Sequence, residues 1–115
     1  MVSHIVLFRP KPDLQPEARD RLVAAFTAAL REIPHLLHAR IGTRVTHGRP
    51  YEQMMGVNYE YAAVLEFADV DRLKAYLEHP VHDALGAAFF ECLEDVLIYD
   101  YEMREGTDAL SRDSD

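Results

Sequence analysis

The sequence predicts an α+β fold, because strand-like and helix-like stretches alternate along its 115 residues in the order strand, helix, strand, strand, helix pair, strand. Short βαβ units with right-handed crossovers, joined through a central pair of strands, form a four-stranded antiparallel sheet with its helices on one face. This arrangement is the ferredoxin-like βαββαβ sandwich. A chain of this length forms one domain with a modest core. We expect that domain over residues 1–103 and a disordered tail over 104–115.

The N-terminal half contains the first strand, the first helix and the second strand. The segment HIVLF at residues 4–8 is a short apolar strand. Pro16 suits the first turn of a helix, and Pro34 ends that helix. Between them, apolar residues recur on one helical stripe, namely Leu22, Phe26, Leu30 and Ile33. Residues 36–45 alternate apolar and polar side chains, which indicates a strand whose charged outer row is typical of a sheet edge.

The C-terminal half begins with a segment that has no periodicity. Residues 46–58 are rich in Gly, Pro and polar groups, which predicts a long loop. Residues 59–67 form the third strand, and residues 69–79 a short helix with Asp69 as its N-cap. A second helix runs from Pro80 through apolar residues at helical spacing, and VLIYDYEM at 96–103 is the last strand.

Several strands are apolar on both faces. The first strand carries Val6 and Phe8 on one side and Ile5 and Leu7 on the other. The last strand likewise has an apolar set on each side, with Leu97, Tyr99, Tyr101 and Met103 opposite Val96 and Ile98. Sheets that are apolar on both faces are covered on both faces, and this chain has helices for only one. The sequence therefore predicts a homodimer whose sheets pack face to face.

Composition excludes several classes of partner. The net charge of −8 would repel a phosphate backbone, so we expect no nucleic-acid partner. No apolar run approaches the length of a membrane span, and the first ten residues lack the features of a signal peptide, so we expect a cytoplasmic protein with no membrane partner. Cys92 is the single cysteine, which excludes an intrachain disulfide and a Cys-rich zinc site.

The stretch AYLEHPVHDAL at residues 75–85 is the strongest functional signal. In a continuous helix Pro80 would clash with the carbonyl group of Tyr76, so one helix ends at about His79 and a new helix begins. Tyr76 and His82 are six residues apart and would point to different sides of one straight helix. The predicted break lets the two side chains converge.

His82 falls near the third position of the new helix. The positive end of the helix dipole disfavours the imidazolium form there, so His82 should stay neutral, as a general base requires. A tyrosine hydroxyl within reach could stabilise a developing oxyanion. His4 lies on the face of Val6 and Phe8 in the first strand, where a polar residue implies a cavity or a partner unless the strand end is hydrated.

The same residues also have a structural interpretation. A His-Pro step stops a helix, His79 can cap the next one, and Tyr76 shares a helical stripe with Val70 and Leu73, where aromatic residues usually belong to the core. A third interpretation is a zinc site built from His79 and His82. Its further ligands would come from Asp83, His4 or Asp100.

These segments together resemble the stress-responsive A/B barrel family, or Dabb domains, of the dimeric α/β-barrel superfamily. The residues that carry the resemblance are HIVLF, YAAVLEF, AYLEHPVH and LIYDYE, in this order from about residue 3 to 103. The resemblance implies a ferredoxin-like subunit and a dimer whose sheets enclose a barrel.

The resemblance also implies roles for individual residues. A plant cyclase of this family performs a cofactor-independent aldol cyclisation of a linear polyketide, and its catalytic histidine and tyrosine match His82 and Tyr76. Its first-strand histidine matches His4, whereas a further pocket histidine falls near Tyr61.

The resulting prediction is a cofactor-free enzyme that acts on a small apolar or carbonyl-containing molecule. Its predicted catalytic residues are His82, Tyr76 and His4, and its predicted substrate-binding residues are Tyr61, His79 and Phe89. The alternative is a non-enzymatic homodimer that binds a small molecule or serves in a stress response, and a haem role is a more distant alternative.

Overall fold

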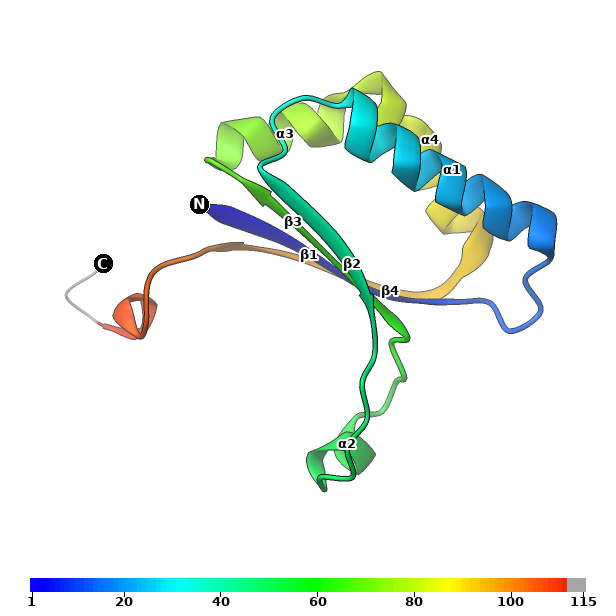
Figure 1. Cartoon of the computed structure of the whole chain (residues 1–115), viewed down its shortest axis with the longest axis horizontal. Helices are drawn as coiled ribbons and strands as arrows, with labels where there is room; N and C mark the ends of the chain where they lie inside the picture. Colours follow the sequence, from blue (N-terminus) through cyan, green and yellow to red (C-terminus); the bar gives the residue numbers. More distant parts are fainter. Residues whose placement is uncertain (112–115) are drawn as a thin grey trace.

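A computed structural model describes residues 1–111 of the chain (Figure 1). The elements follow one another as β1 (Val2–Pro10), α1 (Pro16–Glu32), β2 (His38–Thr43), α2 (Tyr51–Met54), β3 (Tyr61–Phe67), α3 (Val70–Glu78), α4 (Pro80–Cys92), β4 (Leu93–Glu102) and the 3-10 helix η1 (Asp108–Leu110). This order agrees with the predicted one, apart from the two short helices α2 and η1. The predicted tail contains η1, and its last residues, 112–115, lie outside the described part of the chain.

The four strands form one antiparallel sheet in the order β2-β3-β1-β4. Helices α1, α3 and α4 cover one face of this sheet, and no helix within residues 1–111 covers the opposite face (Figure 1). The fold is therefore the predicted ferredoxin-like α+β sandwich. β2 lies at one edge of the sheet, as its charged outer row suggested, and β4 lies at the other edge.

Helix boundaries follow from local side-chain chemistry. The side chain of Asp69 accepts a hydrogen bond from the backbone N–H of Arg72 over 2.9 Å, which confirms Asp69 as the N-cap of α3. Pro16 and Pro80 occupy the first turns of α1 and α4, where a missing N–H costs nothing. β4 starts at Leu93, earlier than the predicted residue 96, because α4 passes directly into the strand without a loop.

The core lies between the sheet and the helices. Val2, Val6 and Phe8 of β1 face it, together with Leu65 and Phe67 of β3. The rings of Phe8, Phe26, Tyr61 and Phe89 pack together at its centre, with Phe8 lying 5.4 Å from Tyr61 and 5.7 Å from Phe89 between ring centroids. Cys92 is fully buried.

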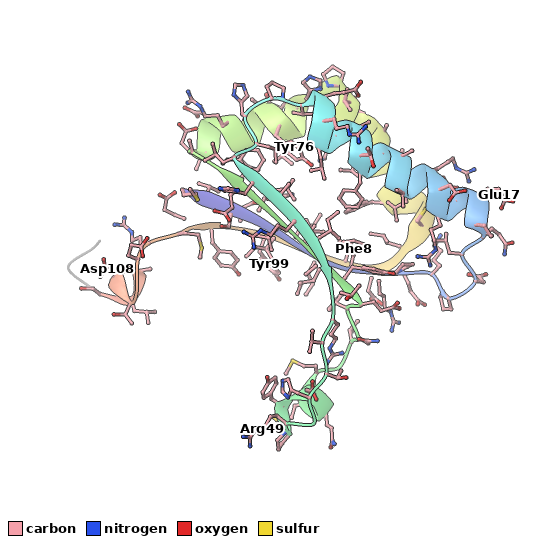
Figure 2. All side chains as sticks on the ribbon, viewed as in Figure 1. Phe8, Glu17, Arg49, Tyr76, Tyr99 and Asp108 are labelled. Atoms are coloured by element: carbon pink, nitrogen blue, oxygen red, sulfur yellow. The ribbon has the colours of Figure 1, made fainter. Side chains whose placement is uncertain are left out.

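The uncovered face of the sheet is also apolar at its centre. Ile5 and Leu7 of β1 are only half-buried, and Leu7 pairs with Leu97 of β4. Tyr99 is 53% exposed and projects from the side of the sheet opposite the helices (Figure 2). The segment between β2 and β3, which contains α2, extends away from the body of the molecule (Figure 1). None of the helices within residues 1–111 is long and apolar enough to span a membrane.

Candidate functional site

A cavity of about 530 Å³ lies between the α3–α4 pair and strands β1 and β4. Most of its wall is apolar, and the polar side chains in the wall come from four residues of different elements. These residues are His4, Tyr76, His82 and Asp100. The site is thus an apolar chamber with one titratable cluster, the composition expected of a small-molecule site.

The joint between α3 and α4 positions two of these residues. His79 is both the C-cap of α3 and the N-cap of α4. Its backbone dihedral angles are extended, as expected for a residue before proline. The ring of His79 accepts a hydrogen bond from the backbone N–H of Val81 over 3.1 Å. The backbone N–H of His79 donates to the carbonyl group of Tyr76 over 3.3 Å. His79 is therefore used in capping the new helix, and it does not line the cavity.

Tyr76 and His82 meet across this joint. Their ring centroids are 5.0 Å apart in an edge-to-face arrangement with an interplanar angle of 75°. Tyr76 is 1% exposed and also packs on Phe67, at 5.3 Å between centroids. Figure 2 shows Tyr76 between α3 and the sheet. Its hydroxyl group has no hydrogen-bond partner among the described residues, so it is available to a molecule in the cavity.

His4 enters the cavity from β1 and is 5% exposed. Its Nδ1 lies 2.5 Å from Oδ1 of Asp100, the residue directly opposite on β4. Because a carboxylate can only accept, Nδ1 carries the proton and Nε2 of His4 is left as the unprotonated nitrogen when the ring is neutral. The His4 ring is 6.1 Å from that of Tyr76, so the two lie side by side.

Burial sets the protonation states of the cluster. Desolvation lowers the pKa of His82, the nearby His4 lowers it further, and Asp83 partly opposes both effects. His82 is therefore neutral at pH 7, with burial as the largest cause. Burial also raises the pKa of Tyr76 to about 12, so its hydroxyl keeps its proton and can donate a hydrogen bond.

The structure brings together four of the six predicted site residues. His4, Tyr76, His82 and Phe89 line one cavity. His79 is a helix cap, and Tyr61 stacks on Phe8 and lines hollows on the other side of the core.

Asp100 is the site residue for which the sequence predicted only a zinc-ligand role. The available signal was that Asp100 falls on the same face of the last strand as the apolar Val96 and Ile98. Its partner could not be named, since that depends on the register between β1 and β4. Among residues 1–111, no three His, Cys, Asp or Glu side chains come together so as to hold a metal ion, so the zinc interpretation lacks a ligand set.

Comparison with known proteins gives the family. Residues 2–103 match the model of the Stress responsive A/B Barrel Domain, called Dabb. The chain belongs to this family. It is 22% identical to olivetolic acid cyclase of Cannabis sativa over 104 residues, which cover 90% of the chain and 98% of the cyclase.

Solved structures agree with the fold. The hydroxynitrile lyase of Passiflora edulis superposes with a TM-score of 0.75 at 21% identity, covering 91% of the chain and 94% of the lyase. A Bacteroides fragilis protein of unknown function, described as dimeric and ferredoxin-like, superposes with a TM-score of 0.62 at 27% identity, covering 89% of the chain and 95% of that protein.

Proposed function

We propose that this Dabb protein is a cofactor-independent enzyme that moves a proton next to a carbonyl group of a small molecule with an apolar tail. The observation that carries the proposal is the convergence of His4, Tyr76, His82 and Asp100 in one largely apolar cavity. An apolar wall favours an apolar substrate body, and the titratable cluster supplies the groups that proton transfer requires.

His82 acts as the general base in this proposal, because burial keeps its imidazole neutral. The substrate C–H bond breaks, its proton passes to the imidazole, and its electron pair forms an enolate. The Tyr76 hydroxyl donates a hydrogen bond to the developing oxyanion. Asp100 holds His4 through Nδ1, so that Nε2 can bind a second polar group of the substrate.

The enolate carbon can then attack a second carbonyl group in the same molecule. A carbon–carbon bond forms, and the resulting alkoxide takes the proton back from His82, which restores the neutral base. The reverse sequence breaks such a bond. Similarity to a cyclase and to a lyase supports this class of reaction.

The test is hydrogen–deuterium exchange at the carbon between the carbonyl groups of linear 2,4-alkanediones, followed by NMR against the rate in buffer alone. We expect wild-type protein to accelerate the exchange and His82→Ala to lower that acceleration by about 100-fold or more. His38→Ala, at an exposed histidine of β2, is the matched control and should leave it unchanged. An acceleration that survives in His82→Ala would refute the role of His82.

A second candidate function is binding without catalysis, which the apolar wall of the cavity favours by itself. In that case the alkanediones bind, but no variant and no wild-type protein accelerates exchange. His82→Ala would then lower the melting temperature through the helix joint alone.

We also propose that the chain forms a homodimer through the uncovered face of its sheet, enclosing a barrel. The half-buried Ile5 and Leu7 and the exposed Tyr99 support this, since an apolar face of this kind is normally covered. The dimeric description of the Bacteroides fragilis protein supports it further. We expect Leu7→Glu to give a monomer in light scattering and Val23→Glu, on the exposed side of α1, to stay dimeric. A dimeric Leu7→Glu protein would exclude this face as the interface.

A further inference from the structure

A second apolar hollow lies on the same face of the sheet as the candidate site. It has a volume of about 260 Å³, is partly open to solvent, and lies between α1 and strands β1, β2 and β3. Leu22 and Leu30 line it from α1, and Ile41 and Tyr61 line it from the strands. Its walls resemble those of the larger cavity, but it lacks the cluster of His4, Tyr76, His82 and Asp100.

Among residues 1–111, Phe26 of α1 is the one residue that lines both hollows. Its ring lies 5.2 Å from Phe89, which belongs to the larger cavity, and 5.9 Å from Phe8, which belongs to the smaller one. Phe8 and Phe89 are themselves 5.7 Å apart, so the three rings close the space between the hollows. Phe26 is 7% exposed, and its ring packs against both Phe8 and Phe89.

The direction of the larger cavity follows strand β1. His4 and Val6 line it from the core face of the strand, and Phe8 is the next residue on that face. Four residues of strand cover about 13 Å. A molecule whose polar end lies beside His4 and whose tail follows β1 therefore meets the rings of Phe8, Phe26 and Phe89 at about that distance from the polar cluster.

We propose that Phe26 limits the length of the apolar tail that the site accepts, by separating the reactive cavity from a second apolar chamber. The identity of the polar end of the ligand rests on the proposed function. The length limit rests on the rings of Phe8, Phe26 and Phe89, which lie between the two hollows. Removing the Phe26 ring joins the two chambers and lets a longer tail continue between α1 and the β2–β3 edge.

The experiment measures affinity for a series of linear 2,4-alkanediones of increasing length by isothermal titration calorimetry. For wild-type protein we expect each added methylene to raise affinity by about fourfold, the value of its transfer from water, until the tail reaches Phe26 and affinity falls. Phe26→Ala should move that maximum to longer homologues. Phe26→Leu should move the affinity maximum in the same direction by fewer methylenes. The leucine variant keeps part of the buried side chain, so it can be measured even if Phe26→Ala fails to fold.

Filling the second chamber provides the matched control. Ile41 is 43% exposed and lines only the smaller hollow, so Ile41→Trp should leave the wild-type length limit unchanged. Combined with Phe26→Ala or Phe26→Leu, Ile41→Trp should restore the shorter limit. A crystal structure of wild-type protein with the best-bound homologue should show the end of its tail against Phe26.

The outcomes separate the two proposals. A length limit that is the same in wild type, Phe26→Leu and Phe26→Ala overturns the inference, and so does a bound tail that ends away from Phe26. A limit that shifts in protein that never accelerates exchange supports the inference and refutes catalysis. Failure of every homologue to bind wild-type protein overturns both.

Discussion

Tyr76→Phe tests whether the buried hydroxyl group is held for chemistry or for stability. The substitution keeps the ring, which packs on His82, Phe67 and His4, and removes only the oxygen. Because that hydroxyl has no hydrogen-bond partner among the described residues, its loss should not lower the free energy of unfolding at pH 7. The hydroxyl faces the cavity and is not among the fully buried, unpartnered polar atoms of residues 1–111, so no marked gain in stability is expected either.

The alkaline range gives a sharper signature. Burial raises the pKa of Tyr76 to about 12, above its ordinary value of 10.0. A pKa that is higher in the folded state means that the unfolded chain loses the proton first. The resulting stability is fully present below pH 10 and is lost as the pH rises toward 12. For these two values the loss at pH 11 is about 1.4 kcal/mol, and Tyr76→Phe removes it.

The assay is urea unfolding followed by circular dichroism at pH 8, 9, 10 and 11, at one fixed protein concentration because a dimer responds to concentration. The free energy of unfolding of wild type should fall relative to that of Tyr76→Phe only above about pH 9.5. Tyr51→Phe, at an exposed tyrosine of α2 whose hydroxyl group contacts the ring of His47, is the control, and its free energy of unfolding should run parallel to that of wild type over this pH range. Parallel pH curves for wild type and Tyr76→Phe would show that this hydroxyl titrates as in water, and the environment described for it would be wrong.

Three further substitutions test the framework of the site. Asp69→Ala should lower the free energy of unfolding by about 1 kcal/mol in urea titration, because the N-cap of α3 is lost. Asp100→Leu should cost about 1–3 kcal/mol, since it leaves Nδ1–H of the buried His4 unpaired, whereas Asp100→Asn keeps an acceptor and should cost less. Leu65→Ala should cost about 3 kcal/mol, because Leu65 is fully buried in the core.

Each of these predictions has a matched comparison. Asp71→Ala, in the first turn of α3 but outside the cap, should change the free energy of unfolding by less than Asp69→Ala. An Asp100→Leu protein as stable as Asp100→Asn would mean that the His4 pair carries no stability. A Leu65→Ala cost near that of Val23→Ala, at an exposed position of α1, would contradict the assigned core.

The sequence was most informative where local chemistry decides the backbone. Pro80 cannot continue a helix from Tyr76, so the joint between α3 and α4 was predictable to the residue. Periodicity likewise located the strands and the three longer helices to within a few residues. The start of β4 was missed, since nothing local marks a strand that continues directly from a helix.

Long-range pairing is the part of the site that local patterns could not give. Asp100 meets His4 because β1 and β4 pair in one register, in which residues 96 positions apart become neighbours. A shift of one residue would turn Asp100 to the other face of the sheet. Tyr61 was predicted from a resemblance to bind substrate, but it packs on Phe8 and lines the smaller hollow instead of the cavity that holds His82.

The joint between α3 and α4 also explains why the side chains of the two histidines around Pro80 make different contacts. His79 must be extended because it precedes proline, and in that conformation its ring reaches the free N–H of Val81 and is used as a cap. His82 lies one turn into the new helix, where its N–H is already bonded to the carbonyl group of His79 and its ring is free to face Tyr76. The structural interpretation of this stretch therefore applies to His79, and the proposed chemical role concerns His82. A His79→Asn protein, which keeps a capping side chain, should retain both the fold and the exchange activity that His82→Ala loses.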